Sequence, residues 1–230
     1  MNKETFKQEL KKLNIEITRE QEQMLEKYYN LLIETNKTTN LTRITNKEEV
    51  YLKHFYDSLT ISKVINLTNQ KIIDIGTGAG FPGIVLKIIY KDLNITLLDS
   101  SKKRIDFLNK VIKELNLTNI KTIHERIENY KEEQFDIVTS RAVAKTNILL
   151  ELSCNLAKIN GYYIFLKGNL EEELTESQNA IKKLNLKLIK KEQFHLPIEN
   201  SKRTIIKIQK QKNSPKEYPR NFAKIKKNPL

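Results

Sequence analysis

The sequence predicts an α/β fold built around a mostly parallel, seven-stranded sheet. From residue 71 onward, apolar runs alternate with amphipathic stretches, which is typical of a parallel sheet with helices on both faces. The run 71–75 leads into a loop with three alternating glycines and then into a helix-like run, a strand–turn–helix unit that opens nucleotide-binding domains. Only a polar turn separates the last two strand-like runs, so we expect an antiparallel hairpin there.

The individual elements follow from these patterns. Apolar residues at helical spacing predict a helix over 18–35. Thr45 and Glu48 form a capping box that starts a second N-terminal helix, on which His54 and Asp57 lie on neighbouring turns. Later helices are expected at 82–90, 101–115, 145–158 and 171–183. Strands are expected at 71–75, 94–98, 119–124, 135–139, 161–166, 185–194 and 203–209.

These elements divide the chain into three parts. Residues 1–68 form an N-terminal helical extension, and residues 69–210 form the nucleotide-binding domain. Residues 211–230 form a basic tail whose three prolines predict an extended path.

The composition excludes several classes of protein. A single cysteine, Cys154, excludes a disulfide framework and a multi-cysteine zinc site within one chain. The histidines at 54, 124 and 195 lack ligand spacing, so we expect no metal site. The start has no apolar signal region and no run approaches a membrane span, so we expect a cytoplasmic protein with no membrane partner. Nothing in the sequence requires more than a monomer.

The charge is strongly positive and unevenly placed. The net charge is +13, and residues 201–230 contain ten Lys or Arg against one acid. Such a tail attracts polyanions, of which nucleic acid is the commonest, although a solvated lysine-rich surface is the alternative. The candidate nucleic-acid contacts are Lys167, Arg203, Arg220, Lys224, Lys226 and Lys227.

The glycine loop supplies the first candidate cofactor contacts, which are Asp74, Gly76, Gly78, Gly80 and Phe81. Its glycines permit positive φ and a close approach of a ligand to the main chain. An ordinary strand–turn–helix corner is the alternative. Phe81 stands where a dinucleotide fingerprint has its third glycine. The loop instead resembles the S-adenosylmethionine loop of class I methyltransferases, which have a Rossmann-like fold.

Two further segments are candidates for the same cofactor. Asp99 ends the second strand and can accept hydrogen bonds from both ribose hydroxyls, or it caps the next helix. Ile127 and Glu128 follow the third strand, where the adenine lies in this fold. Backbone groups there would contact the adenine edge, and a solvated acidic turn is the alternative.

The segment after the fourth strand bears on the methyl acceptor. It has Ser140-Arg141-Ala142 instead of the Asn/Asp-Pro-Pro found in enzymes that methylate exocyclic amines, and Cys154 fits a helical core pattern. This favours a ring nitrogen with a free lone pair, such as guanine N7, for which alignment does most of the work. Arg141 would position the cofactor carboxylate or a phosphate, with a guanine contact or a surface salt bridge as alternatives. Lys167 would contact a phosphate or a base carbonyl, or is solvated.

Together these residues resemble the bacterial 16S ribosomal RNA guanine-N7 methyltransferases, also called the glucose-inhibited division protein B family. The resemblance extends over nearly the whole chain. The motifs that match are Asn40-Leu-Thr-Arg-Ile, His54-Phe-Tyr-Asp-Ser-Leu, Asp74-Ile-Gly-Thr-Gly-Ala-Gly-Phe-Pro-Gly, Leu98-Asp-Ser, Lys103-Arg104, Phe107-Leu108, Thr139-Ser-Arg-Ala-Val-Ala and Tyr218-Pro-Arg.

The resemblance implies an enzyme that transfers a methyl group from S-adenosylmethionine to N7 of one guanine in 16S ribosomal RNA, either free or in the 30S particle. It implies cofactor contacts at Gly76, Phe81, Ile127, Glu128 and Arg141. A class I methyltransferase acting on a small molecule or another RNA is the alternative. A nicotinamide-dependent oxidoreductase and a non-catalytic RNA-binding module also remain open.

Overall fold

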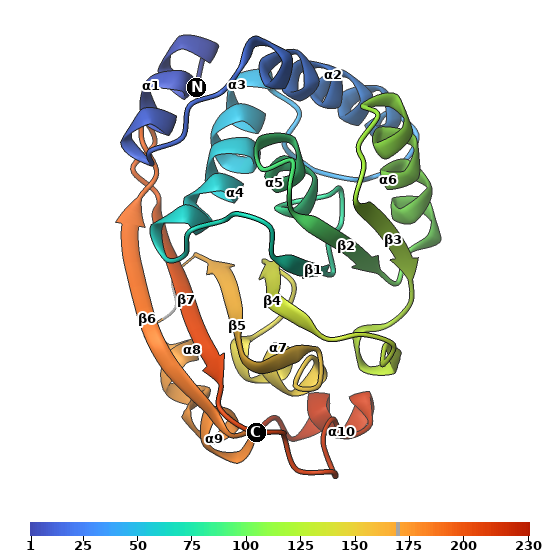
Figure 1. Ribbon diagram of the computed structural model, residues 1–230, viewed down its shortest axis with the longest axis vertical. Coiled ribbons are helices and arrows are strands. Elements are labelled where there is room, and N and C mark those ends of the chain that lie inside the picture. The colour runs from blue at the N-terminus through green and yellow to red at the C-terminus, as the bar shows by residue number, and fades with distance from the viewer. Residues whose placement is uncertain (169–170) are drawn as a thin grey trace.

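A single twisted sheet runs through the middle of the molecule in the computed structural model, which describes residues 1–168 and 171–230 (Figure 1). The strand order is β3-β2-β1-β4-β5-β7-β6. The first five strands pair in parallel, and β7 is antiparallel to both β5 and β6. The predicted fold class is therefore confirmed. The strands are β1 Lys71–Ile75, β2 Asn94–Asp99, β3 Ile120–His124, β4 Phe135–Arg141, β5 Ala157–Lys167, β6 Leu186–His195 and β7 Lys202–Lys210.

The helices cover the two faces of the sheet in separate groups. One hydrophobic cluster joins α5 and α6 to the N-terminal extension, and the other joins α7 and α9 to the C-terminal residue Leu230. The strand order reverses between β1 and β4, so ligands of this fold bind at the carboxyl ends of these strands. The helices after β1 are α5 Gly83–Ile89, α6 Lys102–Glu114, α7 Thr146–Leu152, α8 Glu171–Glu176, α9 Gln178–Lys183 and α10 Phe222–Lys227.

The N-terminal extension packs on α5 and α6 and shares their core. Its helices are α1 Lys3–Lys12, α2 Arg19–Asn36, α3 Lys47–Val50 and α4 Asp57–Leu59, with a π-helical turn at Tyr51–Tyr56 and a 3₁₀ turn at Thr60–Lys63. The helix over 18–35 is confirmed within one residue, whereas α1 was not expected. The predicted capping box is wrong by one residue, because the Asn46 side chain accepts the Glu49 N–H at 3.2 Å. Asn is at least as good an N-cap as Thr.

Two predicted helices are shorter than expected. The helix predicted over 145–158 ends at Leu152, since sheet pairing draws Ala157 into β5 opposite Phe135 and overrides the helical pattern. Cys154 lies fully buried in the intervening turn, as core rather than surface. The segment predicted as one helix over 171–183 contains α8 and α9, which are separated at Ser177.

The tail is not extended throughout, which corrects the prediction for residues 211–230. Residues 222–227 form α10, which lies beside α7 at the lower end of Figure 1. No proline falls between Pro219 and Pro229, and the Asn221 side chain caps the helix by accepting the Ala223 N–H at 2.8 Å. Ile225 is fully buried, so the tail folds back onto the domain.

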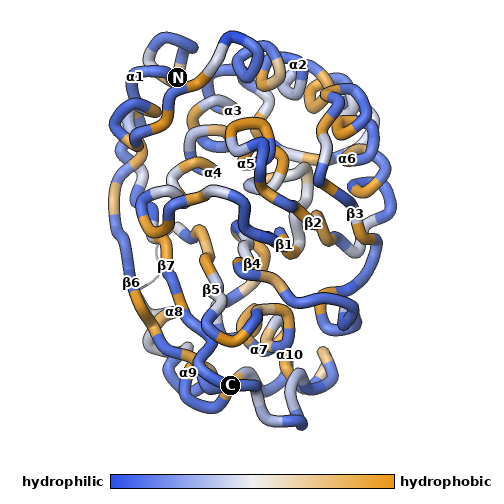
Figure 2. The backbone as a smooth tube through the Cα atoms, in the orientation of Figure 1, coloured by the Kyte–Doolittle hydropathy of each residue, from blue (hydrophilic) through white to orange (hydrophobic). Residues whose placement is uncertain are grey.

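The distribution of apolar residues agrees with this layering. The apolar stretches in Figure 2 lie mainly in the central strands and α5, while β6 alternates between polar and apolar residues. No helix within the described residues is both long and apolar enough to cross a membrane.

Candidate active site

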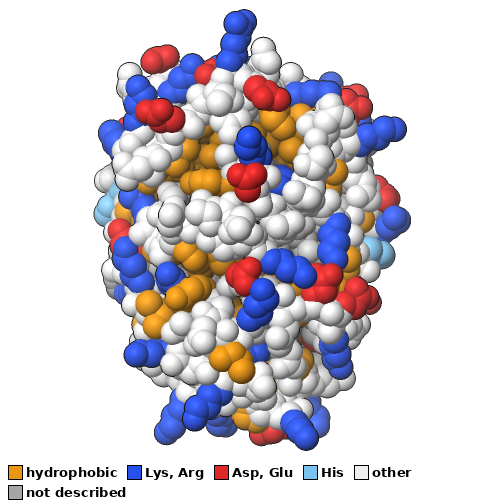
Figure 3. Space-filling model, viewed as in Figure 1, with side chains coloured by type: hydrophobic (Ala, Val, Ile, Leu, Met, Phe, Trp, Pro, Cys, Tyr) orange, Lys and Arg blue, Asp and Glu red, His pale blue; other side chains and the backbone are white. Residues whose placement is uncertain are grey.

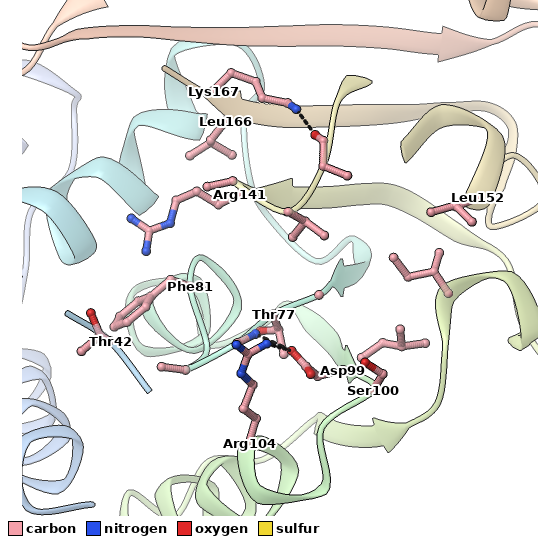
Figure 4. A pocket seen from close by; sticks show the side chains of 18 of the residues that line it. Thr42, Thr77, Phe81, Asp99, Ser100, Arg104, Arg141, Leu152, Leu166 and Lys167 are labelled. Carbon is pink, nitrogen blue, oxygen red and sulfur yellow. Dashed lines mark hydrogen bonds and ion pairs between the residues drawn. The ribbon is translucent and has the colours of Figure 1, made fainter. Parts of the chain in front are cut away.

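A pocket of about 860 Å³ opens at the carboxyl ends of the central strands, within the range of roughly 300–1,000 Å³ typical of ligand sites. The sheet edge provides part of its wall through the β1–α5 loop and the segments that follow β2, β3, β4 and β5. The other walls come from residues 41–44 and 53–57 of the extension, from Arg203 on β7 and from the tail. Figure 4 shows side chains from several of these elements facing one space.

Asp74 shapes the glycine loop from behind. Its Oδ2 accepts hydrogen bonds from Thr77 Oγ1 at 2.6 Å and from the Gly83 N–H at 2.9 Å. Burial raises the pKa of this carboxyl group to about 7. Asp74 is not among the residues that line the pocket, so its role differs from the predicted cofactor contact. It holds the loop in shape.

The glycines of the loop differ in what surrounds them. Gly78 has φ +60° and open space where a side chain would project, so the main chain is bare on the pocket side. Gly80 has φ +98°, and an added Cβ would lie 2.5 Å from Ile84 and 2.8 Å from the Tyr28 hydroxyl. Gly80 therefore presents its Cβ direction to the core and is not among the residues that line the pocket, and its cofactor contact stays a prediction. Gly76 lines the pocket.

Asp99 connects the glycine loop to the start of α6, which agrees with the second of its two predicted roles. Its Oδ2 accepts the Gly78 N–H at 2.9 Å and lies 3.3 Å from Arg104 Nη1, a pair drawn in Figure 4. Its Oδ1 accepts the Ser101 N–H at 2.9 Å at the start of α6. The side chain is only 2% exposed, yet it lines the pocket. Its contact with a ribose stays a prediction. Ile127 and Glu128 also line the pocket.

Arg141 lies over the Phe81 ring, 5.1 Å from its centroid, and reaches the extension. It donates to the Lys53 carbonyl oxygen at 2.6 Å and to His54 Nδ1 at 3.0 Å. Because the guanidinium is always protonated, this contact leaves the His54 proton on Nε2, which donates to Thr42 Oγ1 at 2.9 Å. Burial and the neighbouring Arg141 lower the His54 pKa to about 3, so the imidazole is neutral.

A shared carboxylate joins two arginines beside this group. Asp57 Oδ2 lies 3.3 Å from Arg141 Nη1, and its Oδ1 lies 3.3 Å from Arg203 Nε. Arg203 also lies 3.8 Å from Glu199, which pairs with Lys53 at 3.0 Å. Arg141 is thus held in a partly buried network rather than in a surface salt bridge. Both arginines line the pocket.

Two of the predicted nucleic-acid contacts are paired within the protein, although Lys167 also lines the pocket. Lys167 is buried and donates to the Ala144 carbonyl and to Glu173 Oε1, the latter at 2.7 Å. Arg220 makes two parallel contacts of 2.6 Å to the carboxylate of Glu151, which is fully buried. These cations brace the β4–α7 loop and the tail, so the structure does not support phosphate contacts from them. Lys224, Lys226 and Lys227 are exposed, and Lys226 lines the pocket.

Comparison with known proteins identifies the family. A family model described as rRNA small subunit methyltransferase G matches residues 21–205. The proteins named ribosomal RNA small subunit methyltransferase G from Lachnoclostridium phytofermentans and Desulforamulus reducens are 48% and 46% identical to this chain. Each comparison covers 98% of this chain, with 96% and 97% of the relative. The chain belongs to the rRNA small subunit methyltransferase G family.

Solved structures agree with the fold of this family. A methyltransferase from Pyrococcus furiosus matches 79% of this chain and 94% of its own length, with a TM-score of 0.57 at 14% identity. TYW2 of M. jannaschii, crystallised with AdoMet, matches 73% of this chain and 79% of its own, with a TM-score of 0.57 at 17% identity. At such low identity this likeness concerns the fold, which is that of class I methyltransferases.

The residues around the pocket fit S-adenosylmethionine. The bare main chain at Gly78 leaves room for a ligand, which a side chain would fill. The Asp99 carboxylate lies on the pocket wall and can accept hydrogen bonds from the ribose hydroxyls of S-adenosylmethionine. Arg141, on the same wall, carries a permanent positive charge that can pair with the carboxylate of S-adenosylmethionine. Apolar side chains such as Phe81 and Ile127 complete a lining suited to a flat, partly apolar molecule.

Sequence reasoning missed several residues of the pocket wall. Thr42, His54 and Asp57 belong to the two N-terminal motifs of the family resemblance, so a signal for them was present. Phe222 also lines the pocket, and nothing in its local sequence distinguished it from the rest of the tail.

Proposed function

We propose that this protein methylates N7 of a guanine in 16S ribosomal RNA. It is an S-adenosylmethionine-dependent methyltransferase. The observation that best supports the proposal is that the pocket has two chemically different halves. One half consists of the open glycine loop with Asp99, and the other consists of the arginines that share Asp57. A donor site therefore lies directly beside a cationic wall.

The chemistry of this site requires alignment rather than proton transfer. S-adenosylmethionine supplies an electrophilic methyl group, and the N7 lone pair of guanine forms the new bond as the carbon–sulfur bond breaks. The acceptor loses no proton in this step, so no general base is needed. The neutral, hydrogen-bonded His54 agrees with this scheme, because its pKa of about 3 makes it a poor base at neutral pH.

Cysteine chemistry receives no support from the structure. A nucleophilic cysteine acts as a thiolate, and burial raises the Cys154 pKa to about 11. Cys154 lies in the core rather than on the pocket wall. We assign Arg141 to the carboxylate of the methyl donor, and Arg203, which shares Asp57 with it, to a phosphate group of the acceptor.

The surface supports an RNA substrate. Lysine and arginine side chains are spread over the face in Figure 3 and predominate at its lower end, around α9 and α10. Arg203, Lys224, Lys226 and Lys227 are the RNA contacts that we retain. We propose that the protein acts as a monomer in the cytoplasm on free RNA or on the 30S particle.

Methylation of defined RNA tests this proposal. Purified protein is incubated with labelled S-adenosylmethionine and either 16S ribosomal RNA or 30S particles from cells that lack the protein. Mass spectrometry of nuclease fragments should reveal a single 7-methylguanosine. Incorporation at a pyrimidine or an exocyclic amine, or no incorporation into either substrate, would refute the proposal.

A further inference from the structure

We infer that Phe222 on α10 forms the outer wall of the adenosine end of the methyl-donor pocket, so that the C-terminal tail sets donor affinity. This inference rests on the proposed use of S-adenosylmethionine. It adds a binding residue from a segment that sequence reasoning assigned to RNA alone.

The position of Phe222 is the first argument. Its side chain lines the pocket, and the residue is 37% exposed. The Arg126 guanidinium stands 4.6 Å from the ring centroid. Arg126 in turn donates to Glu128 Oε1 at 2.6 Å. The tail is thereby joined to the segment after β3, where the adenine of the donor is expected.

The attachment of the tail is the second argument. Six residues of isolated helix are unstable in water, so the position of α10 depends on its contacts. Arg220 pairs with the buried Glu151 on α7, and Arg220 Nη2 also donates to the Asn228 carbonyl at 3.0 Å. At the far end, Leu230 is buried and its carbonyl oxygen accepts from Asn147 Nδ2 at 3.1 Å. Both ends of α10 are therefore fixed to α7.

Chemistry identifies the occupant of this wall. An exposed aromatic ring beside a cation suits a flat heterocycle, because stacking removes apolar surface from water. The neighbouring pocket residues include Asp99, which suits the hydroxyls of a nucleoside. Adenosine is therefore a better match than a phosphate group.

Calorimetry on the full chain without RNA is the decisive experiment. Phe222→Ala should weaken S-adenosylmethionine binding about tenfold or more, since loss of base–aromatic stacking typically has effects of this size. Phe194→Ala is the matched control. Phe194 is a half-buried phenylalanine on β6 with the Lys63 ammonium 5.1 Å from its ring centroid, and it lies outside the pocket wall. Its donor Kd should stay within about twofold of wild type.

The outcomes separate this inference from the proposed function. Absence of donor binding by the wild-type protein would overturn the proposed function. Wild-type binding that Phe222→Ala leaves unchanged would overturn only the inference. Weaker RNA binding by Phe222→Ala with an unchanged donor Kd would assign the ring to RNA and also overturn it.

Fluorescence provides a second readout. The chain contains no tryptophan, so Phe222→Trp would introduce one reporter at the wall. S-adenosylmethionine should change its emission, while the emission of Phe194→Trp should not change. Unchanged emission of Phe222→Trp at saturating donor would contradict the inference.

Discussion

Removal of one buried hydroxyl should weaken both the fold and the donor site. Tyr28 on α2 is fully buried, and its hydroxyl donates to the Ala79 carbonyl of the glycine loop. Its ring also lies 5.5 Å from that of Phe81, and Ala79 and Phe81 both line the pocket. Tyr28→Phe keeps the ring and removes the donor. The loop then has a buried carbonyl without this partner.

The size of the effect follows from the burial of that carbonyl. An unsatisfied buried acceptor costs about 1–3 kcal/mol. For a chain of this length each kcal/mol lowers Tm by about 2–4 °C, so we expect a decrease of about 2–12 °C. Tyr29→Phe is the matched control, because Tyr29 donates to the Thr45 carbonyl at 3.2 Å in an exposed setting. The Tyr29→Phe variant should lose less than about 0.5 kcal/mol of unfolding free energy.

The assays are urea denaturation and donor calorimetry on both variants. Tyr28→Phe should show the larger loss of unfolding free energy together with a several-fold weaker S-adenosylmethionine Kd. Equal effects of the two variants in both assays would refute the argument that the extension supports the loop through this hydroxyl.

Four other substitutions test the site. Asp74→Asn should raise the unfolding free energy, measured in urea at several pH values. Because the folded pKa of about 7 exceeds the ordinary 3.8, ionised Asp74 destabilises the fold fully above about pH 7. The advantage of Asn should therefore shrink from pH 7 toward 4, and a pH-independent difference would contradict the assignment. Gly78→Ala should weaken donor binding at least tenfold in calorimetry, whereas Gly80→Ala should mainly lower Tm, because its Cβ meets packed side chains. Asp57→Asn should lower the unfolding free energy by about 1.5–3 kcal/mol and reduce RNA methylation, since it loses a charge-assisted hydrogen bond to Arg141 and an ion pair with Arg203. Wild-type RNA methylation by this variant would count against the arginine pair.

The features predicted correctly from the sequence depend on local patterns. Strand–helix alternation and a helix-free turn before β7 were sufficient to predict the order and direction of the strands. Alternating glycines after β1 were sufficient to predict the loop at the pocket. Asp99 follows the same logic, because a residue at the end of β2 must lie at the carboxyl edge beside the loop. Each inference needs only neighbours in the chain and the rules of parallel sheets.

The features that were missed depend on partners that are distant in sequence or in the packed interior. Arg220 and the exposed Lys224 look alike in a charge count, yet the former pairs with a buried glutamate on α7. Lys167 likewise forms an ion pair within the protein, because the Glu173 carboxylate lies 2.7 Å from its ammonium group. Asp74 and Gly80 belong to the loop motif, but only the packed structure shows that they support it from the core side. Charge and motif membership therefore identified the right segments but not the direction that each side chain faces.

Segments from both ends of the chain meet at the donor pocket, and this arrangement has an energetic consequence. α2 holds the loop through Tyr28, the helical segment around Asp57 holds Arg141, and α10 presents Phe222. Since coupling free energies are reciprocal, a segment that raises donor affinity by some factor is held more firmly by the same factor once donor binds.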